Sequence, residues 1–156
     1  MYIPIWIIVI GIIIYFVWRV RKPKIISKAK GLELIQDEID KKENYVLQKI
    51  KGSHIADYMQ TETTLFECGK KNFIRLQEGF RHDDKKLGES IKDWIYYLDY
   101  ISNLIHHHEM LDLATSDSDA DDATKQHQEI VAKMQEIDKR TRDLLGKDYT
   151  DPTKLL

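Results

Sequence analysis

The sequence predicts an all-α fold in which one transmembrane helix precedes a small antiparallel bundle of about four helices. Three observations lead to this prediction. An uncharged, isoleucine-rich block lies before Arg19, and apolar residues in the rest of the chain recur at spacings of three and four, which is the repeat of a helix face. The chain has three prolines and seven glycines among 156 residues, so few positions interrupt a helix.

The chain is expected to contain one folded domain behind an anchor. The predicted parts are a transmembrane anchor over residues 1–20, a basic juxtamembrane linker over 21–30, a helical domain over 31–146 and an extended tail over 147–156. A domain of this size is sufficient for one hydrophobic core. Cys68 is the single cysteine, so no disulfide can form within the chain.

Residues 2–18 form the predicted membrane-spanning helix. They include eight isoleucines and no charged side chain, and a helix of this length extends about 26 Å, close to the thickness of the hydrocarbon core. No basic residue precedes the block and no A-x-A-like cleavage site follows it, which favours a retained anchor over a cleaved signal peptide. The residues expected to characterise the anchor are the interfacial aromatics and one isolated glycine: Trp6, Gly11, Tyr15 and Trp18.

Six basic side chains, with no acidic one among them, follow the predicted span. They are Arg19, Arg21, Lys22, Lys24, Lys28 and Lys30. By the positive-inside rule, this basic collar places the C-terminal domain in the cytoplasm and the N-terminus outside a plasma (inner) membrane. The collar is also expected to attract anionic lipid headgroups, although it could act as a topology signal alone. Beyond residue 30, 18 basic side chains accompany 26 acidic ones, and this net charge of −8 disfavours nucleic acid as a partner.

The first two helices of the domain are expected over residues 28–51 and 54–80. Gly52 and Ser53 between them are typical of a helix end and an N-cap. A coiled-coil-like stripe in the first helix suggests a solvated stalk or a helix packed on one side: Leu32, Ile35, Ile39 and Val46. The apolar face of the second comprises Ile55, Tyr58, Leu65, Phe73, Leu76 and Phe80. Because residues 61–76 are rich in threonine and aromatic side chains, a β-hairpin is left open there.

The third helix is expected to follow a turn at His82–Asp84 and to lie at the centre of the core. Its apolar arc comprises Leu87, Ile91, Trp94, Ile95, Leu98, Ile101 and Ile105. Its aromatic residues could instead form a docking surface, but aromatic side chains at helical spacing are more often core. We interpret the acidic segment Ser116–Asp122 as a linker, after which a fourth helix runs to Leu145 and ends at Gly146.

A histidine cluster is the first candidate metal site. Residues 106–108 are histidines and Glu109 follows them, but consecutive helical residues point about 100° apart and cannot converge on one ion. The pairs that share a face are His106 with Glu109 and His108 with Asp112. Further ligands would have to come from facing helices, where the candidates are His54, Asp57, Glu62 and His127. A polar helix end is the favoured interpretation, and no metal or other cofactor is expected.

The acidic segment partly matches a calcium-binding loop. Its first three ligand positions are acidic: Asp117, Asp119 and Asp121. However, Asp122 stands where the loop needs glycine, and Gln128 stands where it needs a bidentate glutamate, so no calcium site is expected. Cys68 lies beside two lysines that could lower its pKa, but we interpret it as a small packed residue.

The leading functional hypothesis is a membrane-tethered interaction module, with the lipid bilayer and a protein partner, or a second copy, as its contacts. The sequence has no nucleophile elbow, P-loop or dinucleotide fingerprint, so enzymatic activity is uncertain and less favoured. Two alternatives stay open. One is a helical bundle that binds a metal or catalyses a reaction through residues 106–112, and the other is a small membrane-active phage lysis or defence component.

Overall fold

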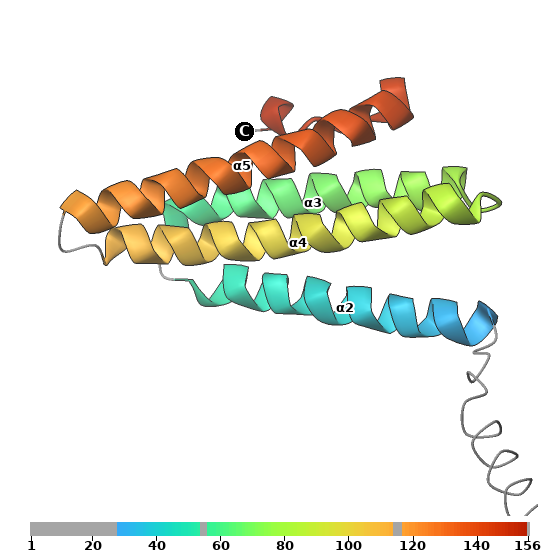
Figure 1. Cartoon of the computed structure of the whole chain (residues 1–156), viewed down its shortest axis with the longest axis horizontal. Helices are drawn as coiled ribbons and strands as arrows, with labels where there is room; N and C mark the ends of the chain where they lie inside the picture. The colour runs from blue at the N-terminus through green and yellow to red at the C-terminus, as the bar shows by residue number, and fades with distance from the viewer. Residues whose placement is uncertain (1–27, 54–55, 114–116, 156) are drawn as a thin grey trace, which may run out of the picture. The chain divides into compact units, whose positions relative to one another are not determined.

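A computed structural model describes residues 28–53, 56–113 and 117–155 of the chain (Figure 1). The elements are α2 (Lys28–Gly52), α3 (Ala56–Gly79), α4 (Asp84–Asp112), α5 (Asp117–Leu145), and the 3-10 turns η1 (Gly146–Asp148) and η2 (Pro152–Lys154). These ranges contain helices and no strand, so the prediction of an all-helical bundle is confirmed.

The contacts divide the chain after Gln36, inside α2. Of the first unit, the structure describes residues 28–36, the beginning of that helix. The second unit holds the remainder of α2, the three following helices and the C-terminal tail.

The predicted membrane span over residues 2–18 lies outside the described residues, and the side chains of the basic collar lie outside them as well. Across the ranges that are described, no helix combines the length and the apolar character that crossing a bilayer requires.

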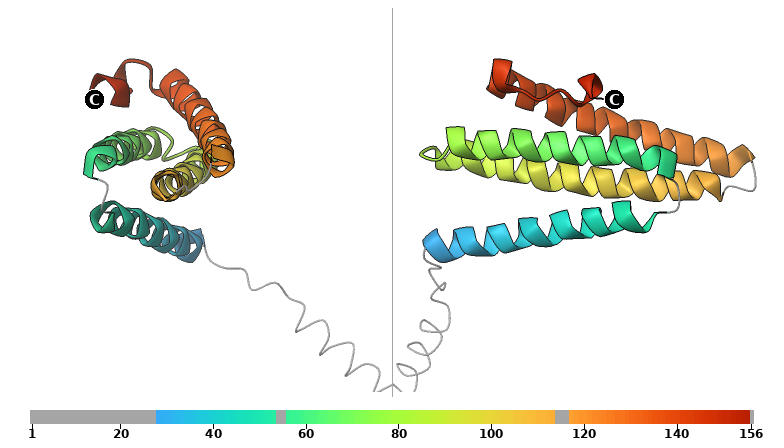
Figure 2. Two further views of the ribbon diagram at one scale, coloured as in Figure 1. Left: turned by 90° about the vertical axis from the view of Figure 1, so that its left-hand side faces the viewer. Right: turned by 180° about the vertical axis from the view of Figure 1, so that it is seen from behind.

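Helix α4 is the centre of the bundle, as the sequence predicts. It runs antiparallel to both α3 and α5 and packs more extensively on each than they pack on one another (Figures 1 and 2). The fully or nearly fully buried apolar side chains of α4 are Trp94, Tyr97, Leu98, Ile101, Leu104 and Ile105. Neighbouring helices complete the core with Ile39, Val46, Phe66, Phe73, Met134 and Ile137.

A close approach between α3 and α4 requires glycine at position 69. A Cβ atom there would lie 2.7 Å from Cζ3 of Trp94 and 2.9 Å from Cε1 of Tyr97, which is closer than van der Waals contact allows. The space that Gly69 leaves open lets the Trp94 ring stack on Phe73, with ring centroids 5.4 Å apart. This contact fixes the spacing of the two helices at the middle of the core.

Residues 61–76 lie wholly inside α3, so the hairpin alternative is wrong and the predicted second helix is confirmed. Phe66, Phe73 and Leu76 recur at the spacing of one helix face, and all three are buried. Their packing against α4 outweighs the β preference of the threonine-rich segment. The side chains of Ile55 and Tyr58, which belong to the predicted face, lie outside the described residues.

The second half of α2 is held to the bundle by two buried apolar side chains with a buried carboxylate between them. Ile39 and Val46 are each 1% exposed. Between them, the buried carboxylate of Glu43 accepts hydrogen bonds from Trp94 Nε1 at 3.0 Å and from Lys70 Nζ at 2.5 Å. In the first half of the predicted stripe, Leu32 and Ile35 are exposed, and coiled-coil pairing there stays a prediction.

The ends of α4 and α5 follow from local chemistry. Asp83 caps α4, because its carboxylate accepts a hydrogen bond from the backbone N–H of Lys86 at 3.1 Å. Helix α5 already begins at Asp117, so residues 117–122 form its first turns and the prediction of a linker over them is wrong. Acidic residues are favourable in the first turns of a helix, next to the positive end of its dipole.

Gly146 ends α5 as predicted, with φ of +54°, in the left-handed conformation that glycine adopts without strain. The tail differs in part from the predicted extended segment. Its backbone is extended at Tyr149 and Asp151, but the 3-10 turns η1 and η2 lie on either side.

Candidate functional site

A groove of about 590 Å³ opens between α4 and α5 and continues to the end of α3. It exists because α5 packs mainly on α4 and contacts α3 less. We call this surface the α4–α5 groove. Its apolar lining consists of Leu76, Phe80, Tyr96, Tyr100, Ile137 and Leu144.

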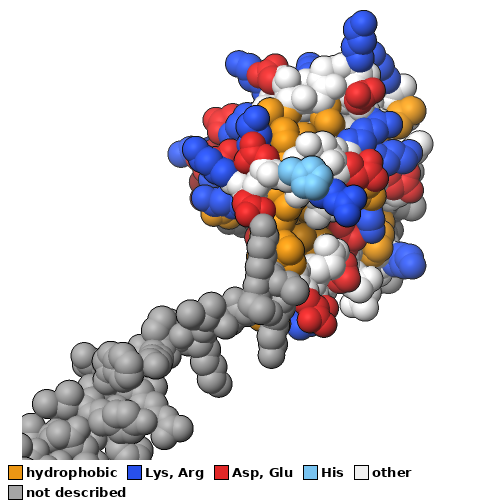
Figure 3. Space-filling model, turned by 90° about the vertical axis from the view of Figure 1, so that its right-hand side faces the viewer, with side chains coloured by type: hydrophobic (Ala, Val, Ile, Leu, Met, Phe, Trp, Pro, Cys, Tyr) orange, Lys and Arg blue, Asp and Glu red, His pale blue; other side chains and the backbone are white. Residues whose placement is uncertain are grey.

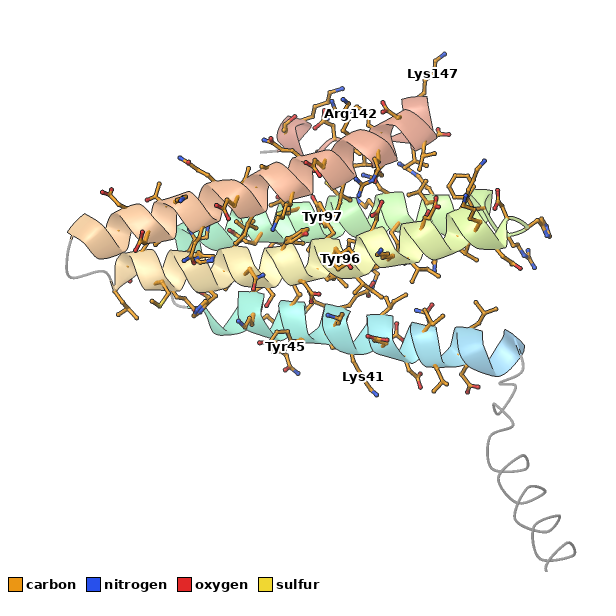
Figure 4. All side chains as sticks on the ribbon, in the orientation of Figure 1. Lys41, Tyr45, Tyr96, Tyr97, Arg142 and Lys147 are labelled. Atoms are coloured by element: carbon orange, nitrogen blue, oxygen red, sulfur yellow. The ribbon has the colours of Figure 1, made fainter. Side chains whose placement is uncertain are left out.

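The aromatic wall of the groove comes from one face of α4. Tyr96 is 45% exposed, and its ring stacks on that of Tyr100 with centroids 6.5 Å apart. The ammonium group of Lys92 lies 5.6 Å from the centre of the Tyr96 ring, within the range of a cation–π contact. The adjacent Tyr97 is buried, because it points about 100° away from Tyr96 around the helix (Figure 4).

Charges of both signs line the rim of the α4–α5 groove. Arg140 of α5 donates to both carboxylate oxygens of Asp93 of α4, from Nη2 at 2.8 Å and from Nε at 3.2 Å. This hydrogen bonding raises the pKa of Arg140. The other charged lining residues are Lys86, Glu89, Lys92, Lys133 and Glu136. Acidic and basic side chains are likewise interspersed on the face drawn in Figure 3, with apolar side chains visible between them.

The residue types that line the groove are apolar, aromatic, hydroxylic and charged. Its lining residues include neither histidine nor cysteine. The hydroxyl of Ser90 donates to the backbone carbonyl of Lys86 at 2.9 Å. A serine–histidine or cysteine–histidine pair, a common arrangement in covalent catalysis, is therefore not among the residues that line the groove.

Part of the predicted histidine constellation does converge at the other end of α5. His108 Nε2 of α4 lies 3.0 Å from Glu62 Oε1 of α3, and the His108 ring meets the ring of His127 of α5 edge-on with centroids 5.2 Å apart. Glu62 is 1% exposed. Among the described residues, its second oxygen, Oε2, and Nδ1 of His127 are buried without a hydrogen-bond partner.

Burial controls protonation in this cluster. Desolvation raises the pKa of Glu62 and lowers the pKa values of His108 and His127, so the neutral forms of all three groups are favoured. The pKa of His107 is also lowered, first by desolvation and then by the neighbouring histidines. The cluster is a polar contact between three helices, and Glu62 is its buried member.

The predicted metal ligands are only partly brought together. Of the facing-helix candidates, Glu62 and His127 meet His108, whereas the side chains of His54 and Asp57 lie outside the described residues. Among the described residues, no group of three or more His, Cys, Asp or Glu side chains is placed to hold a metal ion.

Cys68 is buried at 1% exposure and packs inside the bundle. Its pKa is raised, chiefly by desolvation, so the nearby lysines do not activate the thiol. The predicted anchor residues of segment 2–18 and the lipid-headgroup residues of the collar fall outside the described side chains.

Several of the polar contacts were not foreseen from the sequence. They involve Glu43, Asn72, Asp93, Asp138 and Arg140. The sequence does indicate the aromatic wall, because the helical repeat places Tyr96 off the buried face of Trp94, Leu98, Ile101 and Ile105.

No protein-family model, curated protein or solved structure matches this chain.

Proposed function

We propose that the chain is a membrane-tethered helical module that binds a protein partner in the α4–α5 groove. The observation that carries this proposal is the groove itself, an open surface on which Tyr96 is exposed. Exposed aromatic residues and arginine beside an apolar depression are typical anchors of protein interfaces.

The lining indicates the chemistry of the partner. Tyr96 and Leu144, 45% and 54% exposed, offer apolar area that water covers poorly. The Arg140–Asp93 pair and the remaining rim charges include both signs, which fits a polypeptide segment with an apolar side flanked by mixed charges. An amphipathic helix of a partner protein has this composition.

Tethering is the second part of the proposal and rests on the sequence. The uncharged block over residues 2–18 holds the chain in the membrane, and the basic collar keeps the helical domain on the cytoplasmic side of the plasma (inner) membrane. Confinement to one membrane raises the effective concentration of a partner there, so a contact of modest affinity is sufficient.

Co-purification from native membranes tests the proposal. The full chain carries a C-terminal tag, and Tyr96→Glu places a charge in the groove, while Tyr45→Glu is the matched control because Tyr45 is 53% exposed on α2. We expect the wild type and Tyr45→Glu to retain the same partner after detergent extraction, and Tyr96→Glu to lose at least about nine-tenths of it, an effect of about 1.4 kcal/mol or more.

Two results would remove the proposal. A partner set that is unchanged by Tyr96→Glu would exclude the α4–α5 groove as the binding site. Full-length chain that stays in the supernatant after cell lysis without detergent, followed by ultracentrifugation, would exclude the membrane tether. The metal-binding and membrane-active alternatives stay predictions from the sequence.

A further inference from the structure

The last residues of the chain lie against α3 and α5. After α5 ends, Gly146 turns the chain back, so that Thr150 contacts α3 and Tyr149 contacts α5. Pro152 is buried in this segment, and η2 packs on α3. We call the receiving surface the tail site; the residues that bind the tail there are Asn72, Arg75, Asp138 and Arg142.

Asn72 binds the tail through its backbone. Its side-chain Nδ2 donates to the carbonyl oxygen of Thr150 at 2.9 Å, and the N–H of Thr150 donates to Asn72 Oδ1 at 2.8 Å. The amide therefore pairs with one residue of extended chain as a neighbouring β-strand would, whatever side chain that residue carries. Asn72 is 2% exposed, so water has little access to its side of this pair of hydrogen bonds.

Arg75 extends the same recognition along the tail. Its Nη1 donates to Thr150 Oγ1 at 2.8 Å and also to the backbone carbonyl of Asp148. Two helical side chains thus bind backbone groups on both sides of Tyr149. The backbone contacts require an extended ligand and impose little sequence preference.

The sequence preference comes from α5 and from the proline. The hydroxyl of Tyr149 donates to Asp138 Oδ1 at 3.2 Å, and the guanidinium of Arg142 lies 5.0 Å from the centre of the Tyr149 ring. Desolvation raises the pKa of Tyr149 to about 12, so its hydroxyl keeps its proton at neutral pH. Pro152 fills a buried position three residues further on.

We propose that the tail site is a peptide-binding site, occupied by the chain's own tail until an extended segment of a partner protein, with tyrosine followed three residues later by proline, displaces it. The side chains that bind the tail belong to helices α3 and α5. The tail lies outside the core cluster, and Leu155 at its end is 60% exposed. None of the four residues that bind the tail lines the α4–α5 groove, so the inference goes beyond the function proposed above.

A partner peptide has to compete with the chain's own tail, which is attached to the tail site by a short connection. Residues 146–148 hold the tail next to its site, which gives it a high effective concentration. A free peptide therefore competes poorly with the intact tail and binds well only when the tail is weakened. This difference can be measured.

The test uses the full chain in detergent micelles and a fluorescein-labelled peptide with the sequence of residues 147–155, KDYTDPTKL. The first tail variant is Tyr149→Ala/Pro152→Ala. The second is Thr150→Pro, which removes one backbone N–H and keeps the tyrosine and the proline. Fluorescence anisotropy measures binding, and circular dichroism verifies that each variant is helical.

We expect the tail variants to bind the peptide at least about ten-fold more tightly than the wild type does. Adding Asn72→Ala to either variant should abolish binding, whereas adding Glu78→Ala, at an exposed position of α3, should leave it unchanged. A peptide with alanine in place of both tyrosine and proline should not bind.

Three outcomes would overturn the proposal. The first is no binding to a folded tail variant, and the second is binding that Asn72→Ala leaves intact. The third is a dimer of the wild type, measured by light scattering, that Asn72→Ala dissociates, because the occupant would then be the tail of a second copy. None of these measurements depends on Tyr96, so a failure here is distinguishable from a failure of the α4–α5 groove.

Discussion

Two surfaces flank the C-terminal half of α5, and they differ in what satisfies their polar groups. In the tail site, the buried amide of Asn72 is matched by the backbone of Thr150. At the rim of the α4–α5 groove, Arg140 pairs with Asp93, and the Arg140 side chain is 53% exposed. A buried polar group needs a partner from the protein, whereas an exposed one is hydrated. The tail site therefore needs either the tail or a partner segment bound to it, whereas the groove can stay open until a partner binds.

The largest expected effect comes from the wall that both surfaces share. Ile137 is 7% exposed and lines the α4–α5 groove as well as the small cavity beside Asn72 and Asp138. We expect Ile137→Ala to lower the free energy of unfolding by about 2–5 kcal/mol, because it leaves a cavity in the core. Chemical denaturation of the full chain in micelles, followed by circular dichroism, measures this. A loss below about 1 kcal/mol would mean that Ile137 is not packed as the structure has it.

Asn72→Ala separates the two surfaces. It removes both hydrogen bonds to Thr150 and leaves the groove untouched. We expect the free energy of unfolding to fall by about 1–3 kcal/mol and the amide of Thr150 to exchange with solvent faster. Glu78→Ala on the same helix should change stability by less than about 0.5 kcal/mol. Equal protection of the Thr150 amide in wild type and Asn72→Ala would contradict the bidentate contact.

A smaller effect is expected at the rim of the groove. The Arg140–Asp93 pair has good bidentate geometry, but the Arg140 side chain is 53% exposed. Arg140→Ala should therefore cost about 1 kcal/mol or less, and most of that loss should disappear at high salt. A fall of several kcal/mol in the free energy of unfolding, unaffected by salt, would mean that this pair is buried. That result would contradict an open groove.

The smallest effects concern pH and the cluster at the far end of α5. The pKa values of His108 and His127 are lowered in the folded chain, so below about pH 6.5 the unfolded chain binds more protons than the folded chain does. The contribution of these two groups to the free energy of unfolding is therefore lost as pH falls. The raised pKa of Glu62 acts in the opposite sense, because its contribution is lost as pH rises above the unfolded value of 4.5.

Melting curves between pH 5 and pH 7 separate these opposing contributions. We expect His127→Gln to reduce the gain in stability with rising pH, and Glu62→Gln to increase it. Asn72→Ala, in the tail site, should leave the slope of stability against pH unchanged. A shift of the slope in the same direction by His127→Gln and Glu62→Gln would contradict the assignment.

The helices could be predicted because their apolar positions recur within each segment. The spacing of Trp94, Leu98, Ile101 and Ile105 identifies the central helix from local sequence alone. Gly146 likewise indicates the end of α5. The acidic first turns of α5 were missed because serine and aspartate are also common in linkers, and only the helix dipole distinguishes the two cases.

The binding surfaces could not be predicted in the same way. Asn72 and Thr150 are 78 residues apart, and no periodicity connects an amide on one helix with the backbone of a tail. The convergence of Glu62, His108 and His127 depends on how three helices align, although the sequence did identify these residues as candidates. Conversely, the division of the α4 tyrosines into the buried Tyr97 and the exposed Tyr96 follows from helical geometry.

Site-specific photo-crosslinking in native membranes tests the central claim most directly. A photoreactive phenylalanine analogue replaces Tyr96 in the α4–α5 groove or Tyr45 on α2, two tyrosines of similar exposure (Figure 4). The account predicts that, in the membrane fraction, one defined protein becomes attached through position 96 and not through position 45. Identical products from both positions, or no product from position 96, would contradict it.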